Sequence, residues 1–202
     1  MAVARTYTRR SPEAARALIL EAASQIFAKE LPDRVGMREI AQHAGVSHGL
    51  VTHYFKTYDN LIDEVLERRL DAMHALAFSR LGSATFAPTE SPLLDVMMDV
   101  LDDPALVRLL AWSLLVGRSQ VIGGAGTLGK IIDAMHARVH ALDATVSRER
   151  MEMSVVLAIS MIAGWALAGP SIESGIGRTK PYTRETLRAE LHRMMRAYVQ
   201  ST

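Results

Sequence analysis

The segment Met37–Phe55, MREIAQHAGVSHGLVTHYF, constrains the fold of this chain more than any other segment. Its apolar spacing fits two short helices joined by a tight turn, because Ile40, Ala41 and Ala44 fall on one face of the first helix. Gly45 follows directly and can adopt the positive φ that ends a helix abruptly. The segment therefore predicts two helices held at a fixed angle to each other.

The second helix of this pair presents a polar face. Ser47 can cap it by accepting hydrogen bonds from its free amides, and Val51 and Phe55 point toward the first helix, with Tyr54 at the edge of the core. The opposite face carries His48, Gly49, Thr52 and His53. A helix presented in this way has the shape that enters a DNA major groove, so the segment is typical of a DNA-binding helix-turn-helix.

Composition favours helices throughout the 202 residues. Apolar residues make up 49%, but aromatic residues only 5%, so the apolar content comes from Ala, Leu, Val, Ile and 11 Met. The absence of Cys excludes disulfides, thiol catalysis and Cys-ligated metals, and it fits a reducing cytoplasm. A net charge of +1 excludes a uniformly basic coat, although the tail residues Arg5, Arg9 and Arg10 can reach phosphates.

Capping residues divide the chain into helices. Ser11-Pro12 and Thr57 open the first helix and a long helix over 58–81, and residues 82–91 form a linker. The same signals recur at Ser91-Pro92, Asp103-Pro104 and Thr183. We expect further helices over 127–144, 148–168 and 184–199. The uncharged run Ser154–Ile172 approaches the ~20 residues of a membrane span, but Gly169-Pro170 predicts its end, and a helix buried between protein surfaces explains it better.

The three N-terminal helices and the long fourth helix resemble the TetR family of bacterial transcriptional regulators. The resemblance is carried by Phe27, by REIAQHAGVSHG and by HYFK running into DNLI, and it covers roughly residues 11–66. It implies an all-α fold, with a helix-turn-helix DNA-binding domain over 1–57 and a helical ligand-binding and dimerisation domain over 58–202. It also implies a homodimer formed through helices 148–168 and 184–199.

Roles on DNA follow from geometry and from this resemblance. We expect base-edge contacts from the exposed face of the second helix: Ser47, His48, Gly49, Thr52 and His53. In the family, the residue at Tyr54 often touches the DNA backbone through its hydroxyl. Arg38, Lys56 and Tyr58 are the expected phosphate contacts. Gly36, Thr52 and Tyr58 depart from the residues usual in the family, so the operator sequence cannot be borrowed from a relative.

The C-terminal part has few signatures of its own. The resemblance implies a pocket for a small molecule there, and Met97, Trp112, Met135 and Trp165 are candidates because Met and Trp can line an adaptable apolar cavity. An apolar or aromatic effector is expected.

Other chemical motifs are incomplete. Gly124–Lys130 has the spacing of a phosphate-binding loop, but Ile131 replaces the hydroxyl that would hold magnesium. His136 and His140 lack a third metal ligand, and no nucleophile–base pair is visible. We therefore expect no enzyme, no metal and no cofactor.

The sequence predicts a cytoplasmic homodimeric regulator, a repressor released from a palindromic operator by a small molecule. Repressor and activator use the same DNA unit, so this distinction stays open. Two alternatives remain: a helix-turn-helix used for protein contact without DNA, and a nucleotide-binding protein built on Gly124–Lys130.

Overall fold

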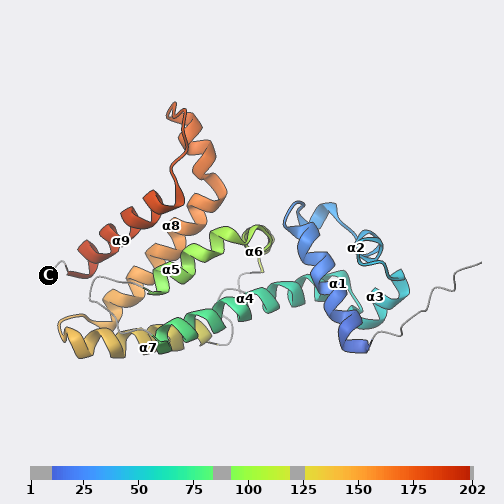
Figure 1. Ribbon diagram of the computed structural model, residues 1–202, viewed down its shortest axis with the longest axis horizontal. Helices are drawn as coiled ribbons and strands as arrows, with labels where there is room; N and C mark the ends of the chain where they lie inside the picture. The colour runs from blue at the N-terminus through green and yellow to red at the C-terminus, as the bar shows by residue number, and fades with distance from the viewer. Residues whose placement is uncertain (1–10, 84–91, 119–125, 201–202) are drawn as a thin grey trace, which may run out of the picture.

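The computed structural model describes residues 11–83, 92–118 and 126–200, and all regular structure within these ranges is helical (Figure 1). The elements are α1 (Pro12–Phe27), η1 (Pro32–Arg34), α2 (Met37–Ala44), α3 (His48–Phe55), α4 (Tyr58–Ser83), α5 (Pro92–Asp99), η2 (Val100–Asp102), α6 (Pro104–Leu115), α7 (Thr127–Leu142), α8 (Arg148–Gly175) and α9 (Arg184–Gln200). The all-α class is confirmed. The arginines of the N-terminal tail, Ser91, residues 84–91 of the predicted linker and Gly124 lie outside the described residues.

Helices begin where the sequence supplies a capping side chain. The hydroxyl of Ser11 accepts a hydrogen bond from the N–H of Ala14 at 3.2 Å, and Pro12 occupies the first helical position, where no N–H is needed. Equivalent bonds of 3.0–3.2 Å are accepted by Ser47, Thr57, Asp103, Ser147 and Thr183. Local chemistry therefore places most helix starts.

Helix α8 is longer than the sequence predicts, because it continues through Gly169-Pro170 to Gly175. Proline removes one helical hydrogen bond but does not by itself end a helix whose later turns are held by other contacts. Gly169 is buried against the indole of Trp165, where a Cβ would lie 3.0 Å from the ring. Beyond the proline, the carboxylate of Glu173 accepts a hydrogen bond from the N–H of Tyr182 at 2.7 Å, which ties the extension to the segment before α9.

Two hydrophobic cores share α4. The first packs α1, α2 and α3 against the first half of α4 and against α6, with Phe27, Phe55 and Ile62 fully buried. The second packs the end of α4 against α5, α7, α8 and α9 around Met98 and Ile131. Figure 1 shows α4 running from the α1–α3 unit to α7. A displacement of this helix in one core therefore reaches the other.

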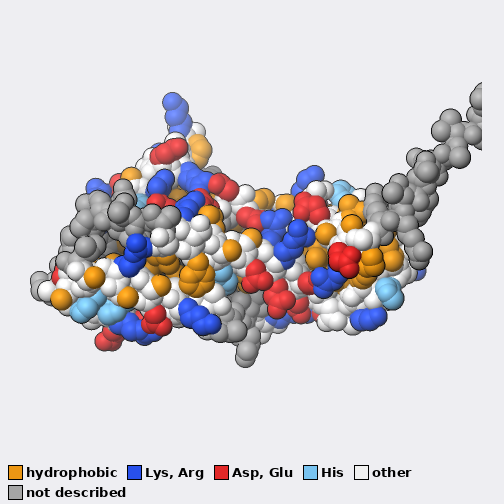
Figure 2. All heavy atoms as spheres, turned by 60° about the horizontal axis from the view of Figure 1, so that its bottom comes forward, with side chains coloured by type: hydrophobic (Ala, Val, Ile, Leu, Met, Phe, Trp, Pro, Cys, Tyr) orange, Lys and Arg blue, Asp and Glu red, His pale blue; other side chains and the backbone are white. Residues whose placement is uncertain are grey.

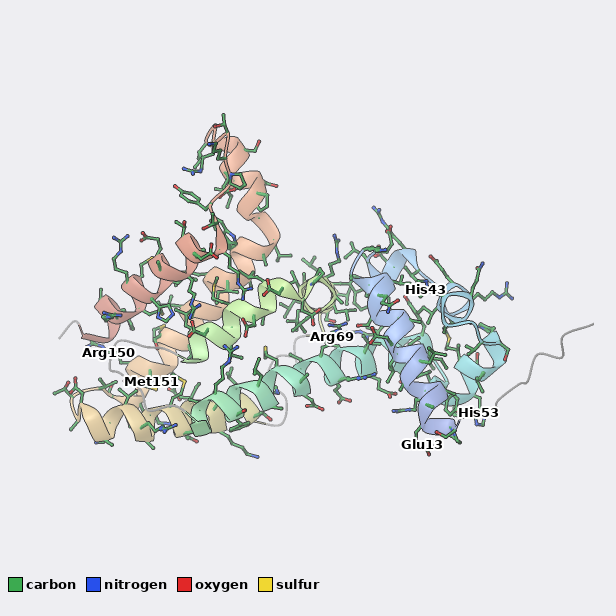
Figure 3. All side chains as sticks on the ribbon, viewed as in Figure 1. Glu13, His43, His53, Arg69, Arg150 and Met151 are labelled. Carbon is green, nitrogen blue, oxygen red and sulfur yellow. The ribbon has the colours of Figure 1, made fainter. Side chains whose placement is uncertain are left out.

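Arg69 fixes the junction between the two parts of the fold. Its guanidinium donates to the hydroxyl of Ser24 in α1 at 2.5 Å and pairs with Asp103, whose carboxylate also caps α6. Figure 3 shows Arg69 where α4 passes close to α1 and α6. One side chain thus fixes the positions of α1, α4 and α6 relative to one another.

Candidate nucleic-acid interface and internal cavity

The turn between α2 and α3 has the predicted geometry. Gly45 lies in the left-handed region with φ 65°, and its N–H donates to the carbonyl of Gln42 at 3.1 Å. The next N–H, of Val46, donates to the carbonyl of Ala41 at 3.0 Å. This pair of bonds satisfies the free carbonyls at the end of α2 and fixes the chain direction into α3.

Helix α3 turns its polar face outward. Val51 and Phe55 are buried on its inner side. The predicted base-contacting residues are all exposed: Ser47, His48, Gly49, Thr52 and His53. The hydroxyl of Thr52 donates to the carbonyl of His48 at 3.2 Å, which ties this hydroxyl to the backbone of α3. The structure therefore brings these five residues together on one accessible surface, with His53 at the far end of the molecule (Figure 3).

Gly49 is not required by the packing of the chain itself. A Cβ at this position would meet nothing within 4 Å, and its φ is not in the left-handed region. Glycine weakens a helix relative to alanine, so this residue costs stability without an internal reason. The open space in front of it allows another molecule to approach the α3 backbone closely.

Lys56 ends α3 in a strained conformation. It has φ 63° and ψ −58°, and the N–H of Thr57 donates to the carbonyl of Phe55 at 2.7 Å, which closes a γ-turn around Lys56. Its ammonium group is exposed and donates to the carbonyl of His53 at 2.7 Å. The turn thus fixes this positive charge beside the polar face of α3.

The other predicted phosphate contacts differ in accessibility. Arg38 is exposed on α2. Tyr54 is half-buried, with its ring edge-on to His53 at 5.4 Å between centroids. The hydroxyl of Tyr58 donates instead to the carbonyl of Pro32 at 2.8 Å, and burial raises the pKa of this phenol well above its ordinary value. Tyr58 therefore anchors η1 to α4, and its hydroxyl is already bonded inside the fold.

The surface charge is mixed. Figure 2 shows Lys and Arg side chains interspersed with Asp and Glu over the face in view, without a continuous basic area. On this face, nucleic-acid binding would depend on shape and on a few placed cations, because the charges in view form no broad attractive field.

A partly open cavity of about 140 Å³ lies between the two cores. Its walls come from α4, α5, α6, α7 and α8, together with Val100 of η2, and nearly all are Leu, Ile, Val, Met or Ala. His74 of α4 is the exception. It is buried, and desolvation lowers its pKa, opposed only in part by Asp71. A neutral imidazole therefore faces an otherwise apolar space near neutral pH.

Of the four residues predicted to line a pocket, Met97 lines this cavity. The others pack elsewhere: Trp112 lies under the guanidinium of Arg118 at 5.2 Å, and Trp165 packs against Tyr182. Met135 packs against the second core. His74 was not among the residues predicted to line a pocket. A single histidine within the apolar stripe of a long helix can nevertheless be recognised in the sequence.

The described residues contain no cluster of three side chains suited to holding a metal. His136 and His140 lie 5.2 Å apart between ring centroids. Lys130 is exposed in the first turn of α7, and only helices occur in the described parts of the chain, so no strand is seen there to precede a phosphate-binding loop. The nucleotide-binding alternative therefore finds no support in this part of the fold.

Known proteins share both the local motif and the whole architecture. The family model for bacterial regulatory proteins of the tetR family matches residues 19–65. The HTH-type transcriptional repressor Rv3405c of Mycobacterium tuberculosis is 29% identical over 167 residues, which cover 82% of this chain and 79% of that protein.

Solved structures agree over almost the full length. A tetR-family transcriptional regulator from Streptomyces coelicolor superposes with a TM-score of 0.64 at 24% identity, covering 98% of this chain and 82% of that one. A transcriptional regulator from Aquifex aeolicus gives a TM-score of 0.64 at 15% identity, covering 90% and 97%. The fold and the exposed α3 define a helix-turn-helix transcriptional regulator that binds DNA. The resemblance to the TetR family is thus confirmed by the match to its family model over residues 19–65 and by these similar regulators.

Proposed function

We propose that this regulator is a cytoplasmic homodimeric repressor that leaves a palindromic operator when a small apolar molecule enters its cavity. The observation that carries the proposal is the path of α4. Only two residues separate the end of α3 from the start of this helix, and its Leu70, Met73, His74 and Ala77 form one wall of the cavity. The M. tuberculosis relative named as a repressor supports the direction of regulation.

On DNA, α3 would lie in the major groove. The exposed side chains of His48, Thr52 and His53 would contact base edges, with Ser47 at the start of the helix and Gly49 at the closest approach. Arg38, Lys56 and the half-buried Tyr54 would contact phosphates and position the helix. The buried bond between Tyr58 and Pro32 gives Tyr58 a supporting role for this surface.

Dimerisation would use α8 and α9. Helix α8 is long and apolar enough to cross a membrane by length and composition, but only 22% of its most apolar window is buried within one chain. Val156, Leu167 and Ile172 are each more than half exposed, and so is Met194 of α9. A second copy of the chain would cover this surface and remove it from water.

Arg118 would couple the cavity to the DNA-binding unit. It follows α6 and pairs with Asp59 and Asp63 in the first turns of α4, while its guanidinium lies over the Trp112 ring. Leu114, on the same stretch of α6, lines the cavity. A ligand that displaces the end of α6 would therefore also displace the start of α4, next to α3, through the ion pairs of Arg118. The ligand must prefer the displaced conformation, because equal affinity for both conformations would shift nothing.

The test begins with selection of duplex DNA from a random pool by the purified full-length protein. Fluorescence anisotropy then measures affinity for the selected sequence, with and without small molecules from an apolar library, and at several salt concentrations. We expect a palindromic sequence, tighter binding than to scrambled DNA, and release by at least one compound. Selection of no sequence would reject the DNA role and favour the protein-contact alternative. Unchanged affinity with a bound compound would reject the switch.

A further inference from the structure

The cavity wall carries one hydrogen-bonding side chain. Among the described residues that line it, His74 is the single polar one, and the rest are aliphatic side chains or methionine. No hydrogen-bond partner for the His74 imidazole occurs among the described residues. A neutral imidazole has one donor and one acceptor, so it can bond a polar group that an entering molecule brings.

The same wall rejects charge. Within the described structure, no Lys or Arg side chain lines the cavity to pair with an anion, and no Asp or Glu lines it to pair with a cation. An ion transferred there would lose its water without gaining an opposite charge. The lowered pKa of His74 agrees with a site that disfavours charged groups.

The size of the cavity sets a further limit. Its volume of about 140 Å³ is close to that of an engineered apolar cavity of roughly 150 Å³ in another protein that binds benzene. The space between the helices therefore accommodates one aromatic ring with a short substituent.

We propose that the effector of this cavity is an uncharged, one-ring aromatic molecule with a single hydroxyl or carbonyl group that hydrogen-bonds to His74. The proposal rests on the proposed function only in the claim that the bound molecule is an effector, that is, a ligand that changes DNA binding. The binding site itself stands on the cavity wall, its volume and the position of His74.

Three probes of nearly equal shape test this class: 4-ethylphenol, ethylbenzene and 4-ethylbenzoate. Calorimetry on the full-length protein without DNA at pH 7.5 measures their affinities. We expect 4-ethylphenol to bind best, ethylbenzene about tenfold more weakly through loss of one hydrogen bond, and 4-ethylbenzoate more weakly than 4-ethylphenol by about 100-fold or more. Equal affinity of the benzoate and the phenol, or no binding of the phenol, would overturn the proposal.

A variant identifies the role of His74. His74→Leu should bring the affinity for 4-ethylphenol down to that for ethylbenzene, while ethylbenzene binds at least as well as before. An unchanged ratio of the two affinities would show that His74 does not bond the ligand. Perturbation of the imidazole ¹⁵N signals of the wild-type protein by 4-ethylphenol, and not by ethylbenzene, gives a second readout that needs no folded variant.

Operator affinity is measured separately with the same probes. Binding of 4-ethylphenol with no change in operator affinity would leave the binding site established and reject the proposed switch. Operator release by another compound, without binding of 4-ethylphenol, would support the switch and reject this ligand class.

Discussion

Two residues of α3 carry a conformational cost. Gly49 weakens the start of the helix, where the open space around it would accept a Cβ. Lys56 takes a positive φ that side chains with a Cβ rarely adopt. Strained or permissive backbone of this kind persists where it serves a surface rather than the core. Gly49 lies on the face that we assign to DNA and Lys56 lies beside it, and each gives a prediction in which stability and binding change in opposite directions.

The first prediction concerns Gly49→Ala. The added methyl group should raise the free energy of unfolding by up to about 1 kcal/mol, because alanine favours a helix over glycine. It should also lower affinity for the selected operator by about tenfold or more, because the methyl group would separate α3 from DNA. Chemical denaturation and anisotropy measure the two effects. Gly129→Ala in α7, also in open space, is the matched control and should leave operator affinity unchanged. Unchanged affinity in Gly49→Ala would contradict close approach.

The second prediction concerns Lys56→Gly. Glycine relieves the positive φ, so the free energy of unfolding should rise by about 1 kcal/mol after the greater entropy of the unfolded chain is subtracted. Loss of the ammonium group should weaken binding to specific and scrambled DNA alike, and lower the slope of log affinity against log salt by about 1. Lys56→Arg keeps the charge and the strain, and should keep both the slope and the stability. A loss confined to the specific operator would instead assign Lys56 to base contact.

At the scale of elements, α4 and α6 form the connection between the two cores. Arg69 with Asp103 holds the start of α6 to α4, and Arg118 with Asp59 and Asp63 holds its end. Partly exposed ion pairs contribute little to stability, typically less than about 1 kcal/mol. Their positions at both ends of one helix nevertheless define how α6 can move. The start is held at the junction of three helices, so displacement is expected at the end.

The third prediction follows from this arrangement. Arg118→Met should leave ligand-free operator affinity within about twofold and should reduce the release of operator by a saturating effector by about two- to fivefold, a coupling loss of about 0.5–1 kcal/mol. Arg148→Met, which removes the pairs with Asp133 and Glu152 near the start of α8, is the control. The measurement is anisotropy with and without effector. Full release by the Arg118 variant would remove this residue from the switch.

For the molecule as a whole, the main open question of packing is the apolar surface of α8 and α9, which a single chain leaves exposed to water. Two copies of a helix-turn-helix related by a two-fold axis would reach half-sites about 34–36 Å apart or a multiple of this distance. The spacing of the two α3 helices then depends on how the α8 and α9 surfaces meet. The way in which two chains dimerise would thus also set the half-site spacing that the dimer can bind.

The fourth prediction tests this surface. Val156 is 54% exposed in the single chain, and Val156→Glu should place a charge in the proposed interface and weaken dimerisation by about 100-fold or more. Light scattering after size exclusion should then show a monomer at micromolar concentration, with loss of operator binding. Leu115→Glu, at a position that is 87% exposed at the end of α6, should remain a dimer. A dimeric Val156→Glu protein would place the interface elsewhere.

The features of this protein that depend on neighbours along the chain can be predicted from its sequence. The caps at Ser11, Ser47 and Thr57, the turn at Gly45 and the exposed face of α3 follow from residues within one or two helical turns. The resemblance to the TetR family rests on the same segment. Local periodicity also separated inward from outward residues of the short helices, because each face repeats about every 3.6 residues.

What lies opposite each helix face becomes visible only in the folded arrangement of the helices. Tyr58 reaches Pro32 across 26 residues, Arg118 reaches Asp59 across 59, and His74 meets an apolar cavity formed by five helices. Trp112 and Trp165, which were predicted to line an apolar pocket, do not line that cavity. Helix α8 continues past its proline, and beyond it Glu173 bonds to Tyr182 of the segment before α9. Such contacts depend on how the helices cross, which the periodicity of a single helix does not contain.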